Sequence, residues 1–389
     1  MKLSDVCFEM HQGINTVADK VKYYECGTPI LQSKNITNGI LDLEDVRFVD
    51  ENDYNKYKER YIPHKGNILL SNIGTIGKSL LIDEEKDFLI AWNIFLIKVN
   101  ESKINSKFLN FYFQYLDMSN YYNKYLTGGT VKFINKKTME NIEIPNISLV
   151  NQIKIAEELE KVQKMIDIRE KQIKKLDELI KSQFLEMFGD ININDKKWNE
   201  DILKNNLSVV GGYAFKSSEF QENGIPILRI GNINTGQFRP KDLMFWKEEK
   251  SLENYAIYPD DVLMSLTGTV GKEDYGNICI IGNEYPKYYL NQRNAKLNIK
   301  ETLKKEYISY ALRVPEIKRR LTGISRGVRQ ANISNKDIEN LKLPIPPIEL
   351  QNQFADFVKK INKQKLGIQK SLEEMKKLQE SLMNKYFGD

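Results

Sequence analysis

The chain has 389 residues, enough for two or three domains that each bury a core of their own. It is 41% hydrophobic and 29% charged, as folded water-soluble proteins are, and no run of about 18 apolar residues predicts a membrane span. Three cysteines at unrelated spacings argue against a disulfide framework and a zinc site, while a net charge of +5 permits a nucleic acid as partner without requiring one. The opening residues contain no signal peptide, so we expect a cytoplasmic protein.

The sequence repeats itself once over nearly its whole length. Phe188-Gly-Asp190 returns as Phe387-Gly-Asp389, 199 positions later. A period of this size is too long for a solenoid and indicates two copies of one unit, so we expect a pseudo-symmetric molecule with a two-part target. Other phrases recur in the same order at offsets of 194 to 199 residues, namely Gly27–Leu31 as Gly224–Leu228, Asn35–Gly39 as Asn232–Gly236, Gly74–Lys78 as Gly268–Lys272, and Asn141–Pro145 as Asn340–Pro344.

Each copy begins with a mixed segment, residues 1–145 and 191–344, in which short β-branched and aromatic runs alternate with Gly, Asn and Pro. Because these strands cluster rather than alternate regularly with helices, we expect compact α+β globules and not a doubly wound parallel sheet. The clearest predicted strands are residues 67–71, 94–99, 261–265 and 277–281, and the clearest predicted helices are residues 107–115 and 306–313.

Each copy ends in a polar segment, residues 146–190 and 345–389, with apolar residues at alternating intervals of three and four. Each could be a surface helix lying on its own globule. Two such helices in one chain, ~42 residues and ~60 Å long, favour a coiled coil. The chain must double back, so we expect antiparallel pairing with the globules at opposite ends. The expected seam is Val162, Ile166, Ile173, Leu176, Ile180, Ile361, Ile368, Leu372, Met375 and Leu382, with Arg169, Lys365 and Gln379 in polar slots.

Residues 72–79 resemble a phosphate-binding loop but lack residues that define it. Asn72 and its counterpart Leu266 stand where the motif has its first glycine, and Glu273 replaces the Ser or Thr that would bind magnesium. We therefore interpret residues 74–78 as a tight turn between two strands, with a lysine that can reach a phosphate.

No other motif predicts catalysis. The chain has no GxGxxG loop after a strand and no Asn/Asp-Pro-Pro-aromatic tetrad of the amino-methyltransferases. Its two histidines, His11 and His64, have no metal-ligand spacing around them. We expect a non-enzymatic chain that binds neither a metal nor a cofactor.

Polar side chains at corresponding places of the two copies are candidates for DNA contact. Arg, Lys, Asn and Gln pair with base edges, whereas Lys, Thr and the amides of glycine loops reach phosphates. The same residue types also form ordinary turns, which is the alternative for each position. The candidates are Lys34, Asn35, Thr75, Lys78, Thr130 and Lys132 in the first copy and Arg229, Asn232, Thr269, Lys272, Arg326, Arg329 and Gln330 in the second.

The order globule, helix, globule, helix, with the repeated phrases, resembles the specificity (S) subunit of a type I restriction–modification system. Residues 327–334 and the Leu-Pro-Ile-Pro-Pro-Ile-Glu-Leu-Gln run at 343–351 carry the resemblance further, and it covers essentially the whole chain. It implies two target-recognition domains, 1–145 and 191–344. The conserved helices would be residues 146–190 and 345–389.

The resemblance implies that each globule reads one half of a split, asymmetric DNA site, at a separation set by the helix pair. It implies two methyltransferase subunits as partners, joined by restriction subunits, with S-adenosylmethionine, ATP and magnesium bound only in those partners. The first copy departs from the pattern: it lacks the Pro-Pro pair before its helix and has only Lys132 where the second has Arg326 and Arg329. The bases that are read do not follow from the resemblance.

Two other functions fit the same pattern. One is a scaffold of two lectin-like or peptide-binding globules joined by a coiled coil, without DNA. The other is the recognition subunit of a related methyltransferase–nuclease assembly. A steep loss of DNA affinity with salt would exclude the first, and co-purification of partners would decide the second.

Overall fold

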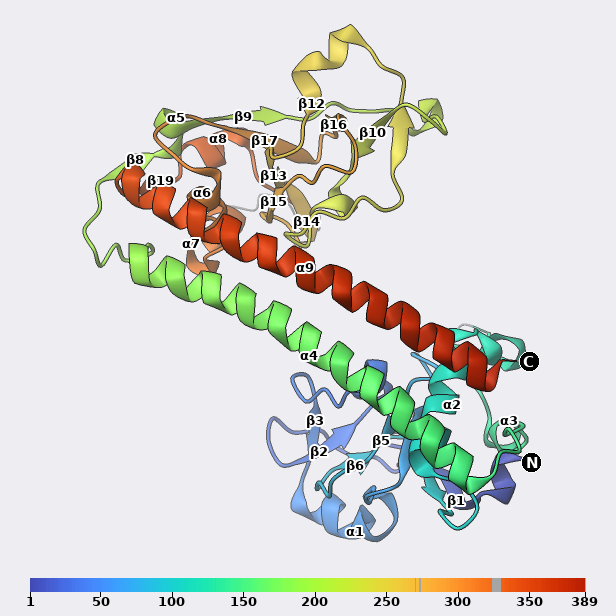
Figure 1. The fold of residues 1–389 in the computed structure, drawn as a ribbon. Helices are drawn as coiled ribbons and strands as arrows, with labels where there is room; N and C mark the ends of the chain where they lie inside the picture. The colour runs from blue at the N-terminus through green and yellow to red at the C-terminus, as the bar shows by residue number, and fades with distance from the viewer. Residues whose placement is uncertain (130, 270, 273, 324–329, 389) are drawn as a thin grey trace. The chain divides into compact units, whose positions relative to one another are not determined.

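The structure is a computed structural model that describes residues 1–129, 131–269, 271–272, 274–323 and 330–388, with the backbone alone at 38 and 330. The chain divides into two compact units, coloured along the sequence in Figure 1. Unit 1 comprises residues 1–170 and 370–389, and unit 2 comprises residues 171–369. Each unit thus contains one globule, part of one long helix and part of the other. No described helix is both long and apolar enough to span a membrane.

The globule of unit 1 begins several of its helices with side-chain caps. Asp50 accepts a hydrogen bond from the backbone N–H of Asp53, and Asn105 accepts one from Phe108, so an orphan donor of the first turn is satisfied. Its helices are α1 (Glu51–Tyr61), α2 (Ser106–Met118) and α3 (Lys136–Glu140), and its strands are β1 (Cys7–Gln12), β2 (Thr28–Leu31), β3 (Arg47–Val49), β4 (Ile68–Ser71), β5 (Ser79–Leu81), β6 (Leu89–Ile90) and β7 (Ile94–Val99).

The globule of unit 2 repeats this order with more elements. Its helices are α5 (Leu203–Asn206), α6 (Lys305–Ala311), α7 (Pro315–Thr322) and α8 (Asn335–Glu339). Its strands are β8 (Glu200–Ile202), β9 (Leu207–Gly211), β10 (Ile225–Leu228), β11 (Met244–Trp246), β12 (Ala256–Ile257), β13 (Val262–Ser265), β14 (Thr267–Thr269), β15 (Ile278–Ile280), β16 (Tyr288–Leu290), β17 (Asn294–Ile299), β18 (Gln330–Asn332) and β19 (Lys342–Pro344).

The two globules share one sheet topology. An antiparallel sheet has the order β1-β7-β4-β5 in unit 1 and β9-β17-β13-β15 in unit 2. A second sheet joins β2 to β6 in parallel, and β10 to β16 in the same way. The predicted mixed α+β class is therefore confirmed, as are the strands and helices expected near β4, β7, β13, β15, α2 and α6. The short ladder of β14 with β18 was not predicted.

Two helices of 40 residues each, α4 (Leu149–Phe188) and α9 (Ile348–Phe387), run from one unit into the other. Within unit 1 their polar side chains pair across the helices: Gln379 donates to Gln163 at 2.6 Å, and the Lys376 ammonium lies 2.7 Å from the Glu170 carboxylate. Tyr386 donates to Glu158, still farther back along α4. The partner numbers run in opposite directions, which confirms the expected antiparallel pairing.

The expected seam residues face inward, and two of the polar slots are used for cross-helix bonds. Gln379 contacts Gln163 in unit 1, and Lys365 contacts Asp177 at 2.6 Å in unit 2. Val162, Ile166, Ile180 and Ile361 are buried, whereas Ile173, Leu176, Ile368, Leu372, Met375 and Leu382 are half-buried. A half-buried seam in the middle of a two-helix pair is the expected result, because only one partner helix covers it.

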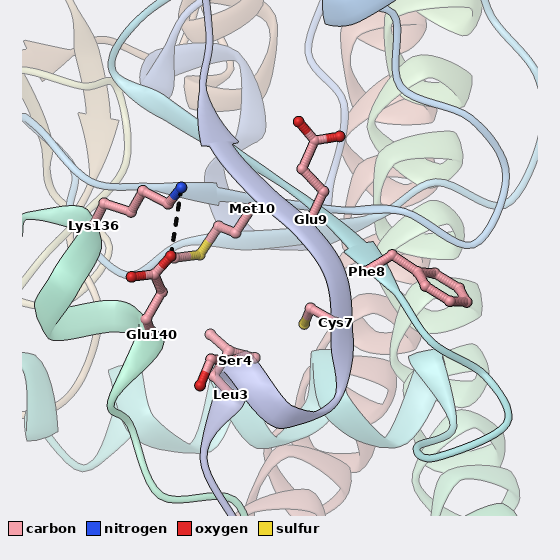
Figure 2. A pocket seen from close by; sticks show the side chains of 8 residues that line it. All are labelled: Leu3, Ser4, Cys7, Phe8, Glu9, Met10, Lys136 and Glu140. Atoms are coloured by element: carbon pink, nitrogen blue, oxygen red, sulfur yellow. Dashed lines mark ion pairs between the residues drawn. The ribbon is translucent and has the colours of Figure 1, made fainter.

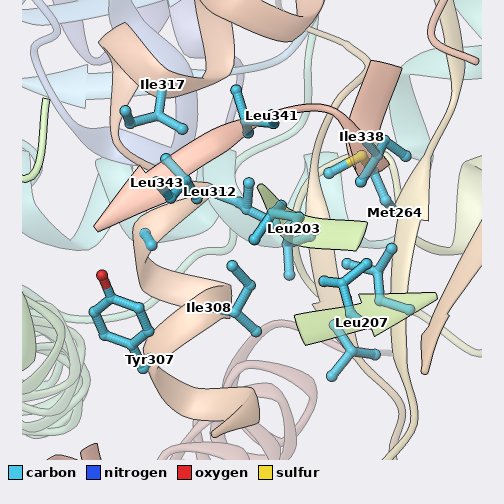
Figure 3. Close-up of a cluster of buried hydrophobic side chains, with 14 of the residues drawn as sticks. Leu203, Leu207, Met264, Tyr307, Ile308, Leu312, Ile317, Ile338, Leu341 and Leu343 are labelled. Carbon is cyan, nitrogen blue, oxygen red and sulfur yellow. The ribbon is translucent and has the colours of Figure 1, made fainter. Parts of the chain in front are cut away.

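The end of each long helix enters a globule core through an aromatic residue of the repeated Phe-Gly-Asp phrase. In unit 1 Phe387 packs against Phe108 and Tyr112 of α2, with ring centroids 5.3 and 5.5 Å apart. In unit 2 Phe188 packs against Tyr307 of α6 at 4.8 Å. Figure 3 shows part of the unit 2 core, where side chains of α5, β9, α6 and β19 meet. The repeat thus explains why the Phe recurs, since it fills equivalent cores.

Candidate nucleic-acid interface

In unit 1 one residue holds two surface loops together. Asn72 directly follows β4; its backbone N–H donates to the carbonyl of Asn93 at 3.2 Å, and its carbonyl accepts from the N–H of Ile134 at 3.0 Å. Asn72 also lies two residues before the predicted turn at 74–78. The loop at 127–134 and the turn at 91–93 therefore meet the turn at 74–78 at the end of one strand.

Unit 2 repeats this junction around the equivalent residue. Leu266 directly follows β13; its N–H donates to the carbonyl of Arg293 at 2.8 Å, and its carbonyl accepts from the N–H of Ile333 at 2.9 Å. Polar loops far apart in the sequence thus converge at matching places in both globules. We call the two places the loop junctions of unit 1 and unit 2.

A third candidate segment joins the junction of unit 1. The hydroxyl of Thr75 donates to the carbonyl of Ser33 at 3.2 Å, so the short helix that carries Lys34 and Asn35 lies against the turn at 74–78. The described candidates of the first copy, namely Lys34, Asn35, Thr75, Lys78 and Lys132, therefore lie on segments that meet at this junction. In unit 2 the matching segment is held by Asn277, whose side-chain amide donates to the carbonyl of Asn234.

The structure gives Asn35 and Asn232 a different role from the expected base contact. Asn35 is 2% exposed; its side-chain oxygen accepts from the Gln32 N–H at 2.9 Å and its amide donates to the carbonyl of Asp42 at 3.0 Å. Asn232 is 4% exposed and makes the same bonds with Arg229 and Arg239, both at 2.9 Å. Each amide is consumed in closing its own loop, which is the alternative that the sequence left open.

The cations of the unit 1 junction are mostly paired with carboxylates. Lys34 lies 2.5 Å from Asp45 and holds the pKa of that carboxyl below its usual value, chiefly through the hydrogen bond. Lys78 lies 2.6 Å from Asp117, and both side chains are about 30% exposed. Lys132 is exposed and has no ion pair among the described residues. Of these three lysines, Lys132 alone can meet a phosphate without first giving up an acidic partner.

Neither described candidate cation of the unit 2 junction, Lys272 or Arg229, is paired with a carboxylate of a described residue. Lys272 is exposed and forms no ion pair with a described residue. Arg229 is half-buried and donates to the carbonyl of Asp242 at 2.6 Å, so part of its guanidinium is already used. Thr269 is exposed, but its hydroxyl donates to Asp274 at 3.1 Å. Thr130, Arg326 and Arg329 lie outside the described residues, as does the side chain of Gln330, whose backbone pairs with Thr269.

A pocket elsewhere in unit 1 is lined by none of the candidate DNA-contacting residues. It measures about 240 Å³ and is lined in part by Leu3, Cys7 and Met10 of the β1 region. Figure 2 shows Lys136 and Glu140 at its wall, where they form an ion pair of 3.4 Å. Burial raises the pKa of Cys7 to about 12, so this thiol is a poor nucleophile at neutral pH. Within the described ranges no group of His, Cys, Asp and Glu could hold a metal ion.

The family model for the type I restriction modification DNA specificity domain matches this sequence twice, over residues 1–178 and 189–376. The two matches cover nearly the whole chain, one copy on each half of the repeat. The chain belongs to the type I restriction–modification DNA specificity family. The resemblance inferred from the repeated phrases is thereby confirmed.

Members of the specificity family align with this chain over most of its length. The MjaVIII specificity subunit of Methanocaldococcus jannaschii is 26% identical over 339 positions, which cover 82% of this chain and 75% of the relative. The MjaIX specificity subunit of the same organism is 24% identical over 402 positions, covering 97% and 90%. A crystal structure of the type I S subunit from M. genitalium matches the fold with a TM-score of 0.58 at 16% identity, covering 100% of this chain and 96% of that one.

The loop junctions could be predicted only in part from the sequence. The sequence indicated the turns at 74–78 and 268–272, but not the turns at 91–93 and 291–293 that lie against them. Ala-Trp-Asn and Asn-Gln-Arg have no identical residue at any matched position, so a search for repeated phrases passes over them. The two turns are 200 positions apart, close to the offset of 194 to 199 between the repeated phrases, and this spacing could have identified them as equivalent.

Proposed function

We propose that this chain is the non-catalytic, DNA-reading subunit of a type I restriction–modification enzyme. Each unit contacts one half of a split, asymmetric DNA site through its loop junction. Two methyltransferase subunits and restriction subunits assemble on the chain and supply the chemistry, with S-adenosylmethionine, ATP and magnesium bound in those subunits.

The observation that carries the proposal is the duplication of the loop junction. Asn72 and Leu266 collect equivalent loops on equivalent strands, so the chain has two surfaces with the same backbone frame. The side chains at equivalent places on these frames differ, with Ala-Trp-Asn at 91–93 on the first and Asn-Gln-Arg at 291–293 on the second. One frame with different side chains supports the reading of two different half-sites, because hydrogen bonds to base edges depend on side chains.

The helix pair supports a fixed separation between the half-sites. A helix of 40 residues is ~60 Å long, and α4 belongs to unit 1 at its start and to unit 2 at its end. Cross-helix bonds such as Gln379 to Gln163 and Lys365 to Asp177 resist sliding of one helix along the other. On this proposal the helices determine how many unread base pairs lie between the two contacts.

The experiment is a selection from random DNA duplexes with the full chain, at two salt concentrations. We expect enriched sequences that share two short motifs at one fixed gap. We also expect affinity that falls steeply with salt, by about one unit of logarithmic slope for each phosphate contact. Enrichment of one uninterrupted motif, or binding without sequence preference, would contradict the proposal.

A further inference from the structure

The turn between β16 and β17 in unit 2 is fixed at every backbone position but presents two side chains to solvent. Gln292 donates its N–H to the carbonyl of Tyr213 at 2.9 Å, and Asn294 closes the turn onto the carbonyl of Asn291 at 2.9 Å. The carbonyl of Arg293 accepts from Leu266 at 2.8 Å. These bonds hold the backbone of the turn in place, so its side chains project from fixed backbone positions.

The underlying backbone comes so close that a glycine is required beside the turn. A Cβ atom on Gly212 would lie 2.2 Å from the carbonyl oxygen of Asn291. In unit 1 a Cβ atom on Gly13 would lie 2.5 Å from the carbonyl oxygen of Ala91. Both units therefore hold this turn at the same close approach.

Every main bond of the turn recurs in unit 1 around Trp92 and Asn93. The N–H of Trp92 donates to Ile14 at 2.8 Å, and that of Ile94 donates to Ala91 at 3.0 Å. The side chains differ at every position of the turn, and Trp92 and Asn93 stand where unit 2 has the exposed Gln292 and Arg293. A duplicated frame whose outward residues are not duplicated has the form of a reading element and not of a structural turn alone.

The presented residues of unit 2 are free to bind. Gln292 and Arg293 are exposed, and neither side chain has a hydrogen bond or ion pair with a described residue. In unit 1 Trp92 is 40% exposed, but the Asn93 amide already donates to the Ser33 hydroxyl at 3.1 Å. A free guanidinium beside a free carboxamide offers bidentate hydrogen bonding, to guanine and to adenine respectively.

We propose that Gln292 and Arg293 are specificity-determining residues that contact base edges in the half-site bound by unit 2. This rests on the proposed function, because it takes duplex DNA as the ligand and names the side chains that read it. The rigid backbone lowers the entropy that is lost on binding. Because the two side chains are adjacent, we expect them to discriminate at one or two adjacent base pairs.

The test compares the full chain with the variants Arg293→Ala, Arg293→Lys and Gln292→Ala by selection from random duplexes at two salt concentrations. The matched control is Lys204→Ala, which removes an exposed cation away from the turn. Lys204 lies just before β9, whose first residue, Leu207, pairs with Ile299 at the end of β17 that is farther from the turn. We expect Arg293→Ala to lose on the order of tenfold or more of the preference at one position of one half-site. Arg293→Lys should not restore it, because lysine lacks the planar fork. The other half-site and the control should keep the wild-type preference.

The outcomes separate the two proposals. If wild type selects a two-part motif and all three variants of the turn keep it unchanged, this turn is not a reading element, although the proposed function stands. If Arg293→Ala weakens all sequences alike and Arg293→Lys restores binding, Arg293 contacts a phosphate and the specificity role is excluded. If wild type selects no motif, the proposed function itself fails. Circular dichroism and the melting temperature of each variant identify loss of folding. Where a variant does not fold, the double variant Gln292→Trp with Arg293→Asn, which copies the unit 1 turn, replaces it. A changed motif in one half-site supports the specificity role, and an unchanged motif excludes it.

Discussion

The side chain of Gln152, at the start of α4, accepts a hydrogen bond of 2.9 Å from the backbone N–H of Asn105, the N-cap of α2. The same side chain donates to the carbonyl of Ile147 at 2.7 Å and is fully buried. Gln351 makes the equivalent pair of bonds with Lys304 and Pro346, at 2.9 and 2.8 Å. One glutamine thus fixes each long helix to the helix of its own globule.

Replacing Gln351 by Leu should destabilise unit 2 by roughly 1–3 kcal/mol, because the part-buried N–H of Lys304 loses its acceptor. The control is Gln353→Leu, on the same helix but exposed, which should change the free energy of unfolding little. Chemical denaturation of both variants measures the difference. Equal effects of the two substitutions would show that Gln351 is not a buried clamp.

Truncation of Phe387 to Ala should loosen the core of unit 1, although Phe387 lies at the other end of the sequence. Its ring packs on Phe108 and Tyr112, so its loss should cost about 3–5 kcal/mol and speed hydrogen exchange in α2. Phe188→Ala should instead speed exchange in α6 of unit 2. Leu378→Ala, at a 50% exposed position of α9, is the control. Faster exchange of α6 in the Phe387 variant would contradict these core assignments.

The ion pair of Lys78 with Asp117 limits how well unit 1 attracts DNA. Asp117→Asn frees the ammonium for a phosphate, so nonspecific duplex affinity should rise and the logarithmic salt slope should steepen by about one unit. Lys272→Ala, which removes an unpaired cation from unit 2, should make the slope shallower by about the same amount. Fluorescence anisotropy at several salt concentrations measures both slopes. An unchanged slope in the Asp117 variant would place Lys78 outside the DNA contact.

Stability of unit 1 should fall below neutral pH because of His11. Burial is the main cause that lowers the pKa of this imidazole below 6.5, and its Nε2 atom has no hydrogen-bond partner among the described groups. As the pH falls through about 6.5 the unfolded chain takes up a proton that the folded chain resists, so folding stability is complete above that pH and declines below it. The His11→Gln variant should show a shallower fall in melting temperature between pH 7.5 and pH 5.5 (about two units apart) than wild type.

His64 supplies the comparison for this experiment, since it is an exposed histidine of the same unit. The comparison with His64→Gln asks whether replacing a buried histidine, and not any histidine, changes the acid dependence of the melting temperature. A His11 variant that loses stability with acid as steeply as wild type would mean that another group governs the acid sensitivity.

Most of the fold could be predicted from the internal repeat and from the heptad pattern of the two long helices. β4 and β7 were predictable because buried β-branched runs bounded by turns have few alternatives, and α4 and α9 because their apolar intervals extend over many turns. The pairing of β14 with β18 was not predictable, because Thr267 and Asn332 are 65 residues apart and nothing local specifies their register.

The site was harder to predict than the fold because one residue type serves opposite roles. Asn35 and Asn232 have the composition of base readers, yet burial and backbone bonds make them loop anchors. The turn that carries Arg293 was overlooked because it repeats in backbone and not in sequence. A search for repeated phrases misses side chains that vary on a constant frame. The hydrogen bonds of Leu266 and Asn72, with the close approaches at Gly13 and Gly212, reveal the shared frame.

If the two units of this chain read two separate halves of a DNA site, exchange of one globule should alter one half alone. Residues 191–344 would be replaced by the equivalent segment of a family member with another target, keeping α4 and α9, and the selected DNA motif would be determined for parent and hybrid. We predict that one half of the motif changes while the other half and the gap between them stay the same. A hybrid that folds and binds DNA but changes both halves, or neither, would contradict the account.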